Sequence, residues 1–254
     1  MTEKHERSGL MHYDAPAGLL GDRVVLITGA GDGIGRAVAL AAAAAGATVI
    51  LHGRTVAKLE AVYDAIVEAG GARPSIAPMD LETADGDSYA SLAESIRDEF
   101  GRLDGLLHNA GILGELTPVA QYDLPLWQRV MHINVTAAVA LTQVCLPLLR
   151  VPETASLLFT SSGVGRTGRA YWGAYSVSKF ATEALAQVLA DENRKTGIRV
   201  NVINPGATRT AMRRSAYPAE DRNALATPED IAPAYLYLLG DDSQALRGAS
   251  VDAQ

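Results

Sequence analysis

The chain has 254 residues, of which 48% are hydrophobic and 20% are charged. This composition is that of a folded globular protein and excludes a disordered or collagen-like chain. The net charge of −7 argues against nucleic acid as a partner, because phosphate binding needs a basic surface. An α/β chain of this length often folds as one domain, and no linker-like stretch divides the sequence.

Cysteine content and the amino-terminal residues both favour a cytoplasmic protein. Cys145 is the only cysteine, so no internal disulfide can form. The first ten residues are polar and charged, and the longest apolar run noted, 37–45, is far shorter than a membrane span. We therefore expect a cytoplasmic protein with no membrane partner and no bound metal.

Residues 1–20 are predicted to form a loose amino-terminal arm, with Met11 as an alternative start, and residues 21–254 to form one domain. From Asp22 onward, short apolar runs alternate with longer helical segments. The predicted strands are 24–28, 48–52, 74–79, 103–108, 156–160, 198–203 and 249–252. The predicted helices are 34–45, 55–69, 88–100, 127–149 and 171–196.

This alternation of strands and helices predicts parallel β-α-β units. The expected fold is a single-domain, Rossmann-type doubly wound parallel sheet of about seven strands, with helices on both faces. In such a sheet the binding crevice lies at the carboxyl ends of the strands. Each motif described below falls at such an end.

A glycine-rich turn, T-G-A-G-D-G-I-G at residues 28–35, joins the first predicted strand to the first predicted helix. Glycines let the backbone turn tightly and approach a pyrophosphate, which then sits at the positive end of the helix. The spacing differs from the usual G-x-G-x-x-G fingerprint, and a purely structural turn is the alternative interpretation. Its position between strand and helix favours phosphate binding.

Tyr175 and Lys179 are four residues apart in a predicted helix, so they share one face. A tyrosine hydroxyl titrates near pH 10, and a nearby ammonium group favours its ionised form. Ser162 follows the fifth predicted strand, where its hydroxyl can bind a substrate oxygen. Asn134 is a polar residue in an otherwise apolar helical tract. Taken singly, each has an ordinary structural interpretation; together they favour acid–base chemistry.

These features together resemble the classical short-chain dehydrogenase/reductase family over nearly the whole chain, from about Asp22 to Asp252. The matching features are T-G-x-x-x-G-I-G at 28–35, N-A-G at 109–111, Asn134, Ser162, Tyr175-x-x-x-Lys179 and N-P-G at 204–206. Within that family, the stretches TGAGDGIG, LHNAG, SSGVGRTGRAYWGAYSVSKFATE and NPGATRTAMR are similar to bacterial YciK-type oxidoreductases. The resemblance does not identify a substrate.

The resemblance implies an oxidoreductase acting on CH-OH and C=O groups of a small carbonyl or alcohol. Tyr175 is then the general acid/base, and Lys179 holds the nicotinamide ribose and lowers the pKa of Tyr175. Ser162 polarises the carbonyl, and Asn134 positions a water that links Lys179 to solvent. Asp80 faces the adenine, and residues 205–210 run along the nicotinamide. Besides Tyr175 and Lys179, the implied cofactor contacts are Gly29, Gly33, Ile34, Gly35, Arg54, Asp80, Leu81, Asn109, Gly111, Pro205, Gly206, Thr208 and Thr210.

The end of the second predicted strand favours NADP(H) over NAD(H). NAD-specific dinucleotide folds place an acidic residue there, whereas this chain has His-Gly-Arg-Thr, in which Arg54 suits a 2′-phosphate. Two residues depart from the family pattern. Asp32 occupies a position that is often basic in NADP-dependent members, and His108 replaces an asparagine.

Several alternatives stay open at this point. The turn spacing and chain length do not fit extended epimerase-like members, and the Tyr–Lys spacing does not fit enoyl reductases. A catalytically silent NADP(H)-binding regulator and an NAD-dependent alcohol dehydrogenase remain as other functions. Family members pair two long helices between subunits, here about 127–149 and 171–196, which implies a homodimer or homotetramer. Arg209, Arg213 and Arg214 in the segment 206–227 suit an anionic substrate or are simply solvated.

Overall fold

The structure is a computed structural model that describes residues 10–254. Within these residues, seven parallel strands form one sheet in the order β3-β2-β1-β4-β5-β6-β7. The strands are β1 (Val24–Thr28), β2 (Thr48–Gly53), β3 (Ser75–Pro78), β4 (Gly105–His108), β5 (Ala155–Thr160), β6 (Ile198–Asn204) and β7 (Ser250–Asp252). The predicted Rossmann-type doubly wound sheet is confirmed.

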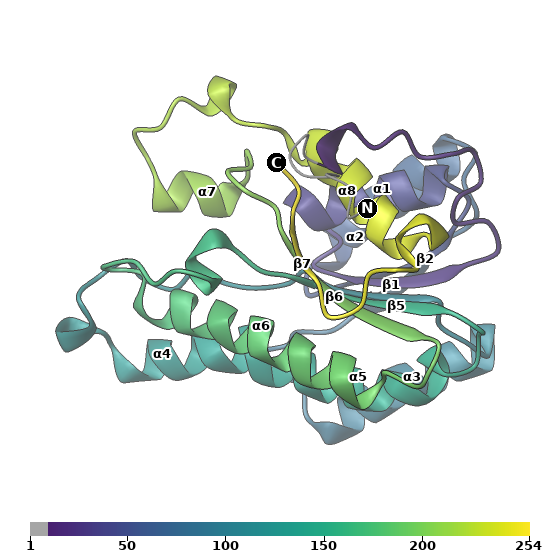
Figure 1. The fold of residues 1–254 in the computed structure, drawn as a ribbon, viewed down its shortest axis with the longest axis horizontal. Coiled ribbons are helices and arrows are strands. Elements are labelled where there is room, and N and C mark those ends of the chain that lie inside the picture. The colour runs from purple at the N-terminus through teal and green to yellow at the C-terminus, as the bar shows by residue number, and fades with distance from the viewer. Residues whose placement is uncertain (1–9) are drawn as a thin grey trace, which may run out of the picture.

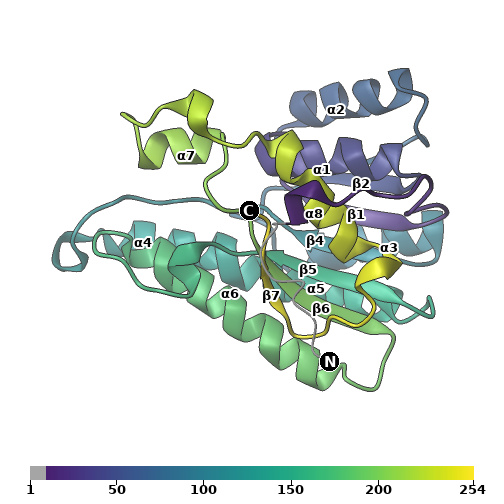
Figure 2. The same ribbon diagram turned by 45° about the horizontal axis from the view of Figure 1, so that its top comes forward.

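Helices cover both faces of the sheet (Figures 1 and 2). One face carries α1 (Gly33–Ala44), α2 (Val56–Glu68) and α8 (Pro228–Leu239). The other carries α3 (Gly86–Phe100), α5 (Ala137–Leu149) and α6 (Gly173–Glu192). The remaining two helices are α4 (Leu124–Met131), which leads towards α5, and the short α7 (Ala211–Ala216), which stands away from the sheet in Figure 1.

The core consists of two apolar clusters, one on each face of the sheet. Successive side chains of a strand point to opposite faces, so the apolar run of β1 supplies both clusters. Val25 and Ile27 pack with α1 and α8, whereas Val24 and Leu26 pack with α3 and α5. A strand buried on both sides is the reason for a continuous apolar run rather than an alternating one.

The expected loose arm at residues 1–20 is wrong for residues 10–20. A short helical turn at Leu10–His12 packs beside α8, and the amide of Met11 donates to the carbonyl of Ala253 over 2.9 Å. The Tyr13 hydroxyl donates to Asp242 over 2.6 Å, and Leu20 is fully buried. Apolar side chains therefore anchor this segment to the domain. Residues 1–9 lie outside the described part of the chain.

Two predicted helices have different bounds in the structure. The helix expected over 171–196 begins at Gly173, because Tyr171 has a left-handed backbone with φ of 73°. The helix expected over 127–149 starts earlier and contains a π-helical turn, His132–Thr136, between α4 and α5. No helix is predicted between 204 and 248, where the structure has α7 and α8.

The continuous helical tract Leu124–Leu149 is, within residues 10–254, long and apolar enough to cross a membrane by length and composition. Half of its most apolar window is buried inside the protein, as in the core helix of a folded domain. The apolar content of this tract thus has a packing explanation. The expectation of no membrane partner stays a prediction.

Candidate active site

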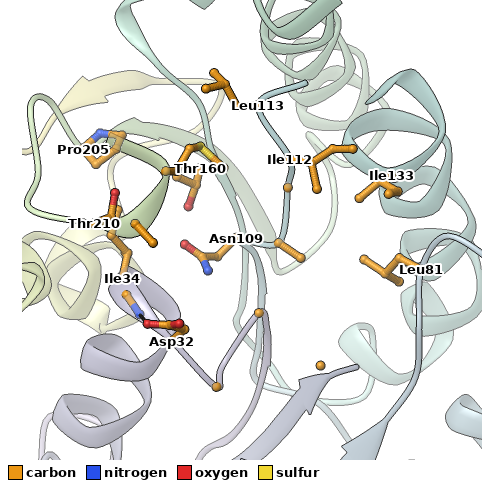
Figure 3. A pocket seen from close by; sticks show the side chains of 18 of the residues that line it. Asp32, Ile34, Leu81, Asn109, Ile112, Leu113, Ile133, Thr160, Pro205 and Thr210 are labelled. Atoms are coloured by element: carbon orange, nitrogen blue, oxygen red, sulfur yellow. Dashed lines mark hydrogen bonds between the residues drawn. The ribbon is translucent and has the colours of Figure 1, made fainter. Parts of the chain in front are cut away.

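A cavity of about 520 Å³ opens at the carboxyl ends of the strands, where the strand order reverses between β1 and β4. Figure 3 shows Asn109 near its middle, between two groups of lining residues. One group contains Asp32, Ile34, Pro205 and Thr210, and the other contains Leu81, Ile112 and Ile133. Each group brings together residues from segments far apart in sequence.

The glycine turn forms an open cradle on this cavity. Gly29 and Gly33 have left-handed backbones, with φ of 68° and 51°, and both line the cavity. Around a Cβ added at Gly33, only atoms of Thr210 lie within 4 Å, the nearest at 3.5 Å. A cradle that a side chain would fill, at the start of a helix, fits the pyrophosphate of a dinucleotide.

Gly35 has a packing role in the turn. It does not line the cavity. A Cβ there would lie 2.2 Å from the carbonyl oxygen of Gly29 and 2.7 Å from the Asn109 amide nitrogen. Gly35 is therefore needed for close packing of helix against turn, and its contact with the cofactor stays a prediction.

The N-A-G turn after β4 is fastened to the end of β1. The Thr28 hydroxyl accepts hydrogen bonds from the amides of Asn109 and Ala110, over 2.9 and 3.0 Å. The Asn109 side chain donates to the carbonyl of Thr28 over 3.1 Å. These bonds hold the two loops together on either side of the switch point.

Ser162, Tyr175 and Lys179 line the same cavity. Tyr175 is 8% exposed. Burial raises the pKa of its hydroxyl to about 12, and a hydrogen bond with Ser162 partly opposes that rise. The expected lowering of the Tyr175 pKa by Lys179 is not what this geometry gives, because desolvation of the phenolate dominates.

Lys179 is held by the strand that precedes Ser162. Its ammonium group donates to the carbonyl of Thr160 over 2.8 Å and lies 5.6 Å from the centre of the Tyr175 ring. Burial lowers the pKa of Lys179 to about 8, partly opposed by the carboxylate of Glu183. One helical turn thus separates two buried groups with strongly shifted pKa values, an arrangement typical of functional sites.

Asn134 lies behind the cavity wall rather than on it. It sits in the π-helical turn, and its amide exchanges two hydrogen bonds with the backbone of Ile112, over 2.8 and 2.9 Å. It also donates to the Ser178 hydroxyl over 3.0 Å. A void of about 10 Å³ is lined by Asn134, Lys179 and His108, among others, and it is close to the space that one water needs.

Two cations stand at the end of the cavity that follows β2. Arg54 and Lys58 both line it, and Lys58 forms an ion pair with Asp32, the amino-terminal cap of α1. Asp32 would repel a phosphate group bound at this corner. Its ion pair with Lys58, a residue not predicted from the sequence, offsets that repulsion. Lys58 lies in the first turn of α2, where the helix dipole disfavours a cation, and that placement was the available signal.

Two buried histidines lie beneath this end of the cavity. His52 lines the cavity with both ring nitrogens lacking a protein partner, and burial lowers its pKa to about 4. His108 shares a hydrogen bond of 2.8 Å with the Thr142 hydroxyl and stacks on Phe159. Burial also lowers the pKa of His108, to about 3, so both rings are neutral at physiological pH. His108 thus fills its position as a packed core residue.

Residues 23–221 match the family model described as short chain dehydrogenase. The chain belongs to the short-chain dehydrogenase family. The uncharacterized oxidoreductase YciK of Escherichia coli K12 is 52% identical to this short-chain dehydrogenase over 244 residues, covering 96% of each chain. The resemblance to YciK-type oxidoreductases is thereby confirmed.

Solved structures of similar short-chain dehydrogenases have the same fold. One from Escherichia coli CFT073, complexed with NADPH, is 53% identical, has a TM-score of 0.92, and aligns over 94% of this chain and 100% of that one. One from Shigella flexneri 2a str. 301, complexed with NADP, gives the same identity, TM-score and coverage. At this identity the likeness extends well beyond the fold.

The structure brings nearly all the predicted site residues of this dehydrogenase together. Every predicted catalytic or cofactor residue except Gly35 and Asn134 lines the cavity. Three lining residues were not predicted from the sequence: Lys58, which pairs with Asp32, Thr160, whose carbonyl holds Lys179, and His52, whose ring lies in the cavity wall. Of the predicted arginines in 206–227, only Arg213 reaches the cavity.

Proposed function

We propose that this chain is an NADP(H)-dependent oxidoreductase that interconverts a small carbonyl compound and its alcohol. The observation that carries the proposal is the presence of Ser162, Tyr175 and Lys179 on the wall of the cavity that the glycine cradle also lines. A dinucleotide laid on the cradle and a carbonyl held at Tyr175 would share one space. A silent cofactor-binding regulator does not need this set of groups.

The charges at the β2 end support NADP(H) rather than NAD(H). Arg54 follows β2 without a carboxylate beside it, and Lys58 offsets Asp32. Charge-assisted hydrogen bonds from guanidinium to phosphate suit a 2′-phosphate. Similar dehydrogenases from E. coli CFT073 and S. flexneri were solved with NADPH and NADP. The remaining predicted contacts, from Gly29 to Thr210, would hold the rest of the dinucleotide.

When bound, the nicotinamide supplies the hydride for reduction or accepts it in oxidation. In reduction, the Tyr175 hydroxyl gives its proton to the carbonyl oxygen while Ser162 donates a hydrogen bond to that oxygen. With a pKa of about 12, Tyr175 is protonated at neutral pH and ready to donate. Lys179 then returns a proton to Tyr175, and the void beside Asn134 gives a water a place in that relay.

The proposal is tested by following NADPH consumption with a panel of aldehydes, ketones and dicarbonyl compounds. The wild-type protein is expected to turn over at least one of these compounds. Tyr175→Phe should lose this turnover, because the substitution removes the transferable proton and little volume. Binding of NADPH to Tyr175→Phe should stay near the wild-type level. Near-normal turnover by this variant would show that the acid/base assignment is wrong, and tight NADPH binding without any turnover would favour the silent regulator.

A further inference from the structure

The cavity beside Tyr175 has an apolar, partly aromatic wall. The Trp172 ring lies 5.9 Å from the Tyr175 ring and 5.8 Å from the Tyr217 ring, measured between centroids. Trp172 is only 9% exposed and lines the cavity, as do Leu113 and Met212. A substrate that presents its carbonyl to Tyr175 therefore meets flat and aliphatic surfaces on this side.

Charged residues line the cavity at two separate ends. The charged lining residues in the described chain are Asp32, Arg54, Lys58, Asp80, Lys179 and Arg213. The first four follow β1, β2 and β3, at the end assigned above to the adenosine half of the cofactor. Lys179 is committed to Thr160 and the ribose. Arg213, from α7, is the charged lining residue left to face a substrate.

Arg213 is already engaged within its own segment. Its guanidinium donates to both carboxylate oxygens of Glu220, over 2.7 and 2.5 Å, in a bidentate pair. The same group stacks 3.9 Å above the Tyr217 ring. About three-quarters of each side chain of the pair is buried, so the interaction is less screened than an exposed ion pair. An anionic substrate would have to displace Glu220, and its charge would meet that carboxylate nearby.

We propose that this site takes neutral carbonyl compounds with an apolar or aromatic group next to the carbonyl. We further propose that Glu220 sets this selectivity against carboxylate-bearing substrates by holding Arg213. Arg213 and Glu220 are positioning and selectivity residues, distinct from the groups that touch the reacting atoms. The inference rests on the proposed function, since it concerns the substrate end of the same cavity.

The test compares 4-methylbenzaldehyde with 4-carboxybenzaldehyde, which have similar shapes and differ in charge. The readout is the ratio of their kcat/KM values with NADPH, because a ratio is insensitive to a general loss of active protein. The wild-type ratio should favour the neutral aldehyde by at least about tenfold, the size of one charge-assisted hydrogen bond. Glu220→Gln should shift the ratio in favour of 4-carboxybenzaldehyde by a similar factor, because it frees the Arg213 guanidinium.

Two further variants test whether the freed Arg213 guanidinium causes the change in the kcat/KM ratio. Arg213→Gln/Glu220→Gln should return the ratio to near the wild-type value, because the freed cation is gone. Glu94→Gln, at an exposed position on α3, removes the same charge far from the cavity and should leave the ratio unchanged. A wild-type preference for the carboxylate, no response to Glu220→Gln, or a gain that persists in the double variant would each overturn the inference. Absence of turnover with every carbonyl compound would instead overturn the proposed function, and the inference with it.

Discussion

Lys58 and Asp32 join the first turn of α2 to the amino-terminal cap of α1, with 2.5 Å between Nζ and Oδ2. Both side chains are more than half exposed, and both line the cavity next to Arg54. A single arginine facing a free carboxylate would attract a 2′-phosphate only weakly. With Lys58 in place, the three side chains Asp32, Arg54 and Lys58 together carry a net positive charge. Cofactor choice therefore depends on three side chains rather than on Arg54 alone.

Arg54→Ala should raise the dissociation constant of NADPH by about tenfold to hundredfold, because it removes charge-assisted hydrogen bonds to the 2′-phosphate. The dissociation constant of NADH should barely change, since NADH lacks that phosphate. Fluorescence titration of both cofactors measures the two values on the same protein sample. Equal losses for both, or a wild-type protein that binds NADH more tightly, would contradict the preference for NADP(H).

The role of Lys58 is separated from that of Asp32 by a double-mutant cycle. Lys58→Ala should weaken NADPH binding severalfold, because the charge of Asp32 then faces the 2′-phosphate without a neighbouring cation. Asp32→Asn alone should tighten NADPH binding. In the Asp32→Asn background, the effect of Lys58→Ala should shrink, with a coupling of about 0.5–3 kcal/mol. All effects should decrease at high salt, because the groups are exposed. Strictly additive losses would mean that Lys58 acts independently of Asp32.

The kcat/KM for carbonyl reduction should be level near neutral pH and should fall as the pH rises through about 8. That is the value to which burial lowers the pKa of Lys179, and loss of its proton removes the positive charge beside Tyr175. Tyr175, with a pKa of about 12, keeps its proton throughout this range. A pH–rate profile with NADPH checks this. A profile that stays level to about pH 10, the range of an ordinary lysine, would contradict it.

Gly35→Ala should lower the free energy of unfolding by about 1–3 kcal/mol, the usual cost of overpacking. The added methyl group would lie 2.2 Å from the carbonyl oxygen of Gly29, and backbone cannot move aside cheaply. The matched control is Gly86→Ala at the start of α3, where nothing lies within 4 Å of an added Cβ. There, alanine should stabilise by a few tenths of a kcal/mol to about 1 kcal/mol. Urea denaturation of both variants measures the contrast, and equal stabilities would refute it.

The protein should sediment as a homodimer or homotetramer at micromolar concentration. α6 exposes Val177, Phe180 and Val188, which are between 43% and 54% accessible, along one of the two helices expected at the subunit contact. Phe180→Glu should shift the distribution towards smaller species, because it places a charge in that apolar surface. Val67→Glu, at a similarly exposed apolar position on α2, serves as the charge control. A wild-type monomer would rule out this assembly.

The sequence by itself determined the elements whose causes are local. Apolar runs of five or six residues separated by helices are enough to predict a parallel sheet and the edge at which its loops meet. Tyr175 and Lys179 share a face because four residues make about one helical turn. Even α8, which was not among the predicted helices, carries a local signal: Thr227 and Asp230 form a reciprocal capping box at its start.

Only the tertiary structure decided which distant groups meet. Asp32 pairs with Lys58, and Asn134 hydrogen-bonds the backbone of Ile112. Leu20 and Met11 pack into the core. No local sequence pattern encodes these contacts. The pKa of Tyr175 likewise follows from burial, which is a property of the whole fold. Contacts and desolvation depend on three-dimensional proximity, whereas turns and helix faces depend on neighbours along the chain. Because motifs depend on residues close in sequence, they could be predicted from the sequence. Their partners depend on residues distant in sequence and could not.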